Sequence, residues 1–201
     1  ALGKPGIDRL HIRFIGDANA TLAAILSGTI QMAFDGGLEF RHAVTLKRDW
    51  AANNGGEVLF HPNQWNSVRF QFRPELQTPK ALGDVRVRKA LASAIDKKAL
   101  NEALFDSEGV LADVMLAPRN LYADAVDTAI VKYPFDVRAT DRFMSEAGFT
   151  KGADGFFANA DGRFRPESKY FDVAQFTGEG TAIASGWRNA EPTCTTMPSR
   201  P

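Results

Sequence analysis

The stretch Asp84-Val-Arg-Val-Arg-Lys-Ala-Leu-Ala-Ser-Ala-Ile-Asp96 decides the fold of this chain. Its apolar residues recur at intervals of three and four, which is the spacing of one face of an α-helix. They are Val87, Ala90, Leu91, Ala94 and Ile95. Asp84 stands directly before this face, where an aspartate can cap the first free backbone amides of a helix. The pattern therefore predicts a helix over 85–95 that begins at Val85 and buries this face in a core.

The residues after this stretch predict further helices and a hairpin. Asp96 can cap a second helix that ends near Gly109, and a third helix starts after Asp136 and stops at Gly148. Asp161-Gly162 is a favoured two-residue turn, so 156–172 is predicted to be a β-hairpin. A last helix is predicted at about 179–190. Residues 191–201 contain three prolines and no regular period, which predicts an irregular tail.

The residues before it predict a mixed α/β region. Residues 9–15 alternate polar and apolar side chains, as a half-buried strand does, with Leu10, Ile12 and Phe14 on one face. A helix capped by Asp17 over 18–26 and a strand over 29–34 would complete a βαβ unit. A second helix is predicted over 38–52, and two more strands over 57–61 and 66–72.

Composition excludes several classes of function. Lys plus Arg number 24 and Asp plus Glu number 24, and no long run of like charge exists, so no surface for nucleic acid is expected. The longest apolar run is too short to cross a bilayer. A single cysteine, Cys194, excludes an internal disulfide, and the three histidines share no metal-ligand spacing. We expect no metal and no cofactor.

Three segments, in order, resemble the extracellular solute-binding protein family 5. The stretch 84–96 is similar to the family's hallmark helix almost residue for residue, and Tyr133-Pro-Phe-Asp136 followed by Met144-Ser-Glu-Ala-Gly148 resembles its next signature. Upstream, Asp17-Ala-Asn-Ala20 with Leu26-Ser-Gly-Thr-Ile-Gln-Met-Ala33 resembles an aspartate-rich turn and the strand after it. The chain departs from the family at Gln31, where Asp is common, and at Glu191-Pro192, where another strand usually begins.

The resemblance implies an α/β fold of the periplasmic-binding-protein type, with a partial two-lobe architecture of type II. Residues 1–66 would be part of the first lobe, which in the family is built from both chain ends, and would contain the βαβ unit. Residues 67–190 would be part of the second lobe with the hallmark helix 85–95, and 191–201 would be the irregular tail. Full-length members are considerably longer, so the chain resembles a portion of such a receptor. Its start has no initiating Met and no export signal, which we expect to lie upstream.

The resemblance also implies a function. The chain would be part of the substrate-binding component of an ABC importer for peptides or similar small solutes, in the periplasmic or extracytoplasmic space. Its partners would be the ligand and the importer's permease subunits. A membrane tether on the full-length protein stays open, and the 201-residue portion is expected to self-associate through exposed apolar surface.

Six residues are candidates for ligand contact. Phe34, Asp35 and Gly36 follow the predicted strand 29–34, and in the resembled family this loop faces the ligand cleft. Gln64 and Trp65 stand at the approach to the predicted lobe boundary, where an exposed aromatic side chain can line a binding surface. Gln175 lies in the loop where some dipeptide-binding relatives carry an Arg for the peptide carboxylate. A plain turn, for the first group, and a core aromatic, for Trp65, remain alternative interpretations.

An enzyme is the rival hypothesis. It would use His11 or His61 with an aspartate and a nucleophile that meet only in the folded chain. Asp84 and Asp96 are better interpreted as helix caps than as a catalytic pair. Cys194 has no histidine or asparagine in a recognisable relation to it, so it is not expected to act as a nucleophile.

Overall fold

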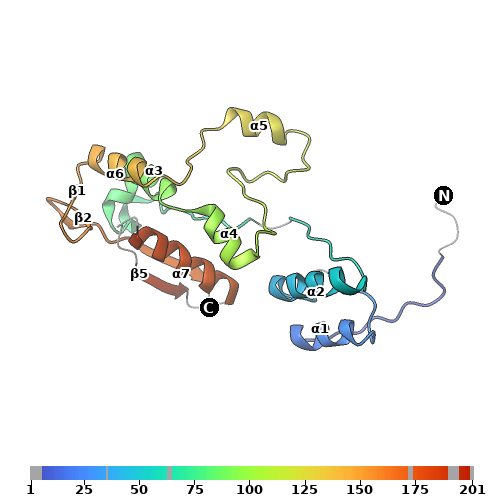
Figure 1. Ribbon diagram of the computed structural model, residues 1–201. Helices are drawn as coiled ribbons and strands as arrows, with labels where there is room; N and C mark the ends of the chain where they lie inside the picture. Colours follow the sequence, from blue (N-terminus) through green and yellow to red (C-terminus); the bar gives the residue numbers. More distant parts are fainter. Residues whose placement is uncertain (1–5, 35, 63–64, 172–173, 190–194, 200–201) are drawn as a thin grey trace. The chain divides into compact units, whose positions relative to one another are not determined.

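A computed structural model describes residues 6–34, 36–62, 65–171, 174–189 and 195–199 (Figure 1). The chain forms two compact units, Ala1–Phe60 and His61–Pro201. The first unit contains helices α1 (Ala18–Leu26) and α2 (Phe40–Asn53). The second contains the short 3-10 helices η1 (Pro74–Leu76) and η2 (Lys80–Gly83), helices α3 to α7 and strands β1 to β5.

The two helices of the first unit lie where the sequence predicted them. The side chain of Asp17 accepts a hydrogen bond from the amide of Ala20 at 2.7 Å, which confirms it as the cap of α1. Ile25 of α1 and Val44 and Leu46 of α2 are buried. Burial of these side chains is what makes two short helices stable together, because isolated helices of this length are marginal in water.

The strands of the βαβ unit predicted within residues 1–66 do not form in the described part of that range. In the described part of the first unit, residues 9–15, 29–34 and 57–60 form no strand, and 66–72 of the second unit form none either. Leu10 is 69% exposed and Phe14 is 97% exposed. A strand exists only when its backbone pairs with a neighbour, and alternation of side chains cannot supply that neighbour. The assignment of these residues to a first lobe stays a prediction.

Helix α3 (Val85–Ser93) confirms the prediction made from the deciding stretch. The amide of Arg86 donates to the Asp84 side chain at 2.8 Å, so Asp84 caps the helix. Val87 and Ala94 are fully buried, Ala90 and Leu91 are 1% exposed, and Ile95 packs against this core at its edge. The other buried members of the core are Leu82, Met144, Phe149, Phe157, Phe164, Ala184 and Trp187.

Helices α4 (Lys97–Phe105) and α6 (Val137–Glu146) also begin after their predicted caps, Asp96 and Asp136. Helix α4 ends at Phe105, four residues earlier than Gly109, because Asp106 and Ser107 adopt left-handed conformations. Helix α6 packs on α3, and the hydroxyl of Thr140 donates to the carbonyl of Ala90 at 3.3 Å. Gly148 follows α6 with φ of +86°, as predicted for a C-terminal cap.

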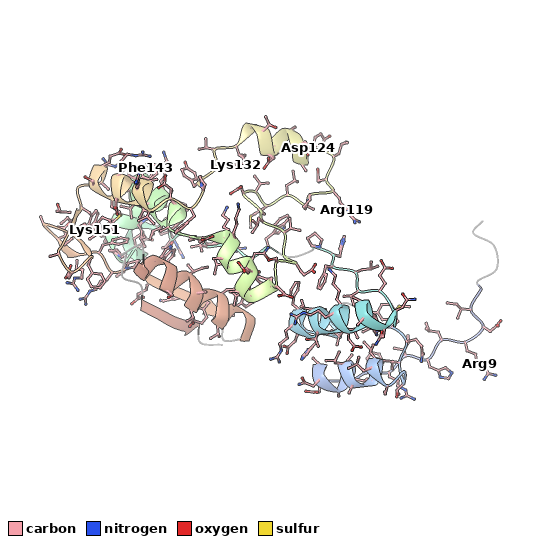
Figure 2. The ribbon with its side chains drawn as sticks, in the orientation of Figure 1. Arg9, Arg119, Asp124, Lys132, Phe143 and Lys151 are labelled. Atoms are coloured by element: carbon pink, nitrogen blue, oxygen red, sulfur yellow. The ribbon has the colours of Figure 1, made fainter. Side chains whose placement is uncertain are left out.

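The connection between α4 and α6 contains a helix that the sequence did not predict. This is α5 (Ala123–Ala129), a seven-residue helix without a buried residue. Arg119, Asp124 and Lys132 are labelled along this connection in Figure 2. Helix α5 has only seven residues, and its N-cap residue, Tyr122, makes no side-chain cap hydrogen bond, so it lacks both the length and the cap signal on which prediction of a helix from sequence depends.

Three short strands follow α6 and form an antiparallel sheet in the order β1-β2-β3. They are β1 (Thr150–Lys151), β2 (Phe157–Asn159) and β3 (Gly162–Arg163). Asn159 pairs with Gly162, so the two loop residues are Ala160 and Asp161, one position earlier than predicted. The rings of Phe149 and Phe164 meet edge to face at 5.5 Å and fix the sheet to the core of the second unit.

The irregular tail predicted for 191–201 is wrong at residues 195–199. These residues form β5 (Thr195–Ser199), which pairs in parallel with β4 (Glu167–Phe171), so that Glu167 lies opposite Thr195. Helix α7 (Ala174–Asn189), longer than the predicted 179–190, connects the two strands in sequence. The prolines suggested a break, but a neighbouring strand with a free edge is a tertiary partner that local sequence does not reveal.

Within the described residues, no helix is long and apolar enough to cross a membrane.

Candidate functional site

The candidate residues of the first unit lie in the connection between α1 and α2. The amide of Gly37 donates to the carbonyl of Phe34 at 3.0 Å, which closes a tight turn. Phe34 is 67% exposed, and Gly36 is exposed with φ of +83°. Asp35 lies outside the described residues. The turn therefore presents an aromatic side chain to its surroundings and buries little of it.

The candidates of the second unit lie on two segments that touch. Trp65 is half-buried, and the side-chain amide of the next residue, Asn66, donates to the carboxylate of Glu179 on α7 at 2.7 Å. Gln175 lies in the first turns of the same helix. Gln64 and the side chain of Gln175 lie outside the described residues. The structure thus joins the segment of Trp65 to α7, while convergence of these residues with Phe34 and Gly36 stays a prediction.

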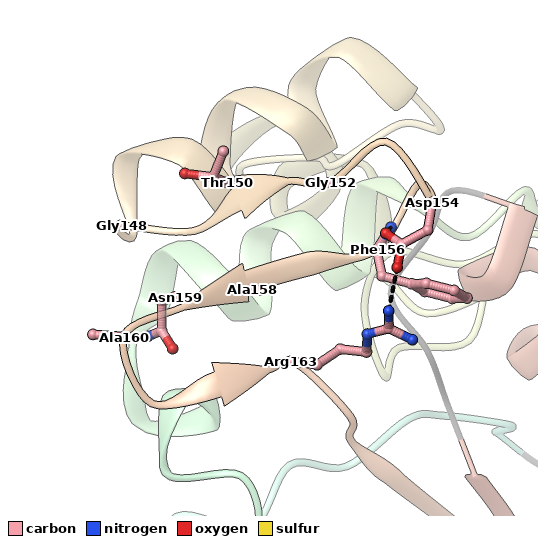
Figure 3. Close-up of a pocket in the computed structure, with 9 residues that line it drawn as sticks. All are labelled: Gly148, Thr150, Gly152, Asp154, Phe156, Ala158, Asn159, Ala160 and Arg163. Atoms are coloured by element: carbon pink, nitrogen blue, oxygen red, sulfur yellow. Dashed lines mark hydrogen bonds and ion pairs between the residues drawn. The ribbon is translucent and has the colours of Figure 1, made fainter.

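A hollow of about 560 Å³ lies on the three-stranded sheet (Figure 3). At one end the guanidinium of Arg163 stacks 4.4 Å from the centre of the Phe156 ring and forms an ion pair with Asp154. The same carboxylate accepts a hydrogen bond from the Phe156 amide at 3.1 Å. The lining residues are Gly148, Thr150, Gly152, Asp154, Phe156, Ala158, Asn159, Ala160 and Arg163.

The chemistry of this hollow is limited. Arg163 and Asp154 neutralise each other, and the side-chain oxygen of Asn159 accepts a hydrogen bond from the amide of Asp161 at 3.0 Å. The remaining lining residues are mainly glycine and alanine, and no histidine or cysteine is among them. The lining can contact a small polar molecule, but it lacks a base beside a nucleophile. Sequence reasoning predicted the hairpin here and did not predict the hollow, because the hollow depends on how the strands twist.

In the part of the chain that the structure describes, the three histidines lie in three different environments. His11 and His61 are exposed, and Nε2 of buried His42 lies 3.1 Å from Oδ1 of Asn19. Among the residues that the structure describes, no three His, Cys, Asp or Glu side chains are grouped closely enough to hold a metal ion. Cys194 lies outside the described residues.

Asp84 and Arg86 form an ion pair at the start of α3. The Arg86 guanidinium donates to both carboxylate oxygens, and it also reaches the carbonyl of Glu146 at the end of α6. The hydrogen bond from this guanidinium holds the pKa of the Asp84 carboxyl below its ordinary value, against a smaller opposing effect of burial. The pair links two helix ends, and Asp84 acts as the helix cap that the sequence predicted.

Comparison with known proteins gives relatives that are much longer than this chain. The chain is 27% identical over 155 residues to heme-binding protein A of Haemophilus influenzae, which covers 77% of this chain and 26% of that protein. It is 21% identical over 182 residues to the oligopeptide-binding protein AppA of Bacillus subtilis, covering 90% of this chain and 30% of that protein. The chain therefore spans between a quarter and a third of these relatives.

Solved structures give the same picture of the fold. The crystal structure of NikA from Brucella suis in complex with Fe(III)-EDTA matches with a TM-score of 0.72 at 17% identity, over 98% of this chain and 38% of NikA. Agreement over nearly the whole chain shows the fold of a type II periplasmic binding protein, present in part, as predicted.

The sequence profile of the bacterial extracellular solute-binding proteins, family 5 Middle, matches residues 1–189, which include all three motifs quoted above. A match over so much of the chain, together with the shared fold, shows that the chain belongs to the bacterial extracellular solute-binding proteins of family 5.

Proposed function

We propose that this chain is the ligand-binding part of a substrate-binding component of an ABC importer, and that the ligand is a peptide or a similar small solute. The observation that carries the proposal is the family match over residues 1–189. The relatives named above are a heme-binding protein and an oligopeptide-binding protein, so the family to which the chain belongs serves recognition of solutes.

The residues that would contact the ligand are the six candidates, Phe34, Asp35, Gly36, Gln64, Trp65 and Gln175. Phe34 supports this proposal, because an aromatic side chain that is 67% exposed on a tight turn gains burial when a ligand covers it. Trp65 supports it through its position beside Asn66, whose bond to Glu179 holds that segment on α7.

Recognition of a ligand without catalysis fits the histidine side chains and the hollow that the structure describes. His11 and His61 are exposed, buried His42 is bonded to an asparagine, and the hollow on β1–β3 has an arginine that is already neutralised. We therefore propose that the chain is not an enzyme and works without metal or cofactor.

The partners and location follow from the same proposal. The receptor would act in the periplasmic or extracytoplasmic space and present its ligand to the permease subunits of the importer. Isolated, the 201-residue chain would self-associate, because large apolar side chains such as Ile12, Phe14, Leu59 and Leu121 are more than 60% exposed. A membrane tether would belong to the longer protein.

Nuclear magnetic resonance of the isotope-labelled chain tests the proposed site. A pool of di- to pentapeptides is added to several millimolar, a range in which even a complex with Kd near ~1 mM is populated. We expect the amides of Phe34 and Gly36 and the indole of Trp65 to shift in a saturable way. Shifts confined to Gly152, Asn159 and Arg163 would place the ligand in the hollow on β1–β3 and contradict the proposed site.

A matched pair of variants separates specific ligand contact from nonspecific adsorption of peptides to exposed aromatic side chains. Phe34→Ala removes a proposed contact, whereas Phe135→Ala removes another exposed aromatic side chain, 49% exposed, that is not a candidate. Loss of the peptide-induced shifts in the first variant alone supports the proposal. Equal losses in both would mean that the peptides adhere to exposed aromatic surface.

A further inference from the structure

The contact between His42 and Asn19 connects the first turns of two helices. Asn19 is the second residue of α1, and His42 is the third residue of α2. Nε2 of His42 lies 3.1 Å from Oδ1 of Asn19, and His42 is only 6% exposed. Because the amide oxygen Oδ1 of Asn19 can only accept a hydrogen bond, Nε2 of His42 is the donor in this contact.

The contact also fixes the path of the connection between the helices. Helix α1 has nine residues and is ~13 Å long at 1.5 Å per residue, so residues 27–39 must run back along it for the two starts to meet. This connection carries Phe34, Asp35 and Gly36. Its first part is held on α1, because the amide of Ile30 donates to the carbonyl of Ala24 at 3.1 Å. Within the connection, the side chain of Gln31 donates to the carbonyl of Gly28 at 2.7 Å.

The far end of the connection depends on the start of α2. The turn from Phe34 to Gly37 is followed within three residues by Phe40, the first residue of that helix. We infer that His42 is a positioning residue: its hydrogen bond to Asn19 holds the start of α2 on α1 and thereby sets the turn that carries Phe34 and Gly36. This rests on the proposed function only in taking that turn as a ligand contact.

The buried environment of His42 favours this role over simple packing. Its Nδ1 is buried without a hydrogen-bond partner among the described residues. A polar atom in that state costs stability, so an apolar side chain of similar size would suit packing better. The imidazole therefore contributes a directional hydrogen bond from Nε2, which a leucine side chain cannot form.

Amide hydrogen exchange of the 201-residue chain, without ligand, tests the inference. His42→Leu keeps an apolar side chain in the buried position and removes the donor, and His42→Gln keeps an N–H donor. We expect His42→Leu to speed exchange of the Gly37 amide about three- to tenfold, as the loss of one hydrogen bond does. The amides of Ser27, the residue after α1, and of Asn54, the residue after α2, should change much less. His42→Gln should restore most of the protection of Gly37.

A second variant tests the same hydrogen bond in case His42→Leu does not fold. Asn19 is exposed, so Asn19→Ala removes the acceptor with little effect on packing. It should speed Gly37 exchange as His42→Leu does, and the double variant should add nothing further. An unchanged Gly37 rate, an equal rise at Ser27 and Asn54, or a His42→Gln variant as fast as His42→Leu would each overturn the inference. Because no ligand is present, these outcomes are independent of whether the chain binds peptides.

Discussion

Leu91 lies at the centre of the core of the second unit. Its side chain is 1% exposed, and its backbone carbonyl accepts a hydrogen bond from Nε1 of Trp187 on α7 at 3.1 Å. The side chain was predicted to be buried from helical spacing alone. Its contact with Trp187, 96 positions away, was not, because no local pattern states which distant residue completes a core.

Leu91→Ala should lower the free energy of unfolding of the second unit by ~2–5 kcal/mol, since it removes buried methyl groups and leaves a cavity. Urea unfolding followed by tryptophan fluorescence measures the change. Leu121→Ala is the control, because Leu121 is 88% exposed and its loss should change the value by less than ~0.5 kcal/mol. Equal midpoints for Leu91→Ala and the parent chain would show that the assigned face is wrong.

The lowered pKa of Asp84 predicts how the stability of the folded chain depends on pH. The hydrogen bond from Arg86 lowers the pKa of this carboxyl in the folded chain, so the unfolded chain binds the proton more readily. The stabilisation is complete above the unfolded pKa of ~3.9 and is lost as pH falls through the lower folded value.

Asp84→Asn isolates this effect, because asparagine also caps helices well. Between pH 5 and pH 2.5, approximate limits chosen around that ordinary value, the parent chain should lose more stability than the variant. Thermal unfolding over a pH series provides the measurement. Parallel curves for the two proteins would mean that the Arg86 hydrogen bond contributes nothing through the charge of Asp84.

At the scale of elements, helices were predicted well and strands poorly. The starts of α1, α3, α4 and α6 follow aspartates that act through bonds to amides within three residues, so the signal is local. The strands predicted at 9–15 and 29–34 needed neighbours, and β5 formed where prolines suggested none, because it pairs with β4. Strand formation depends on residues far apart in sequence, which alternation and proline content do not report.

A substitution at Gly148 tests how the C-terminal end of α6 is stabilised. Its φ of +86° lies in the region that residues with a Cβ rarely adopt, although space around it is open. Gly148→Ala should therefore destabilise the second unit by ~1–2 kcal/mol through backbone strain alone. Gly186→Ala is the control in the same unit, because Gly186 has no positive φ and an added Cβ would meet only the Ala94 carbonyl oxygen, at an ordinary 3.7 Å. A stability loss that is the same in both variants would exclude strain at Gly148 as the cause.

At the scale of the whole molecule, the family could be predicted from the sequence, but whether the six candidate residues meet in one site could not. Three motifs in order identified the family, and the profile match over 1–189 agrees with them. The six candidate residues come from segments in two separate units, and three of them lie wholly or by their side chains outside the described residues. Convergence of distant loops is a tertiary property, so sequence spacing can nominate such residues without showing that they meet.

The affinity of the 201-residue chain for peptides follows from how much ligand surface it can cover. Binding sites for small molecules bury most of the ligand, and affinity comes from that burial after ordering costs are met. The chain spans 26% and 30% of the two curated relatives and 38% of NikA, so most of the surface of a receptor of that length is outside it. Its exposed candidate Phe34 and half-buried Trp65 can each contact a ligand without enclosing it.

We therefore expect binding of the di- to pentapeptide pool to be weaker than ~10 μM, equivalent to roughly 7 kcal/mol. Isothermal titration calorimetry of the purified chain measures this value, with a mixture of free amino acids as the control. Saturable binding tighter than that limit would show that these 201 residues enclose a complete site.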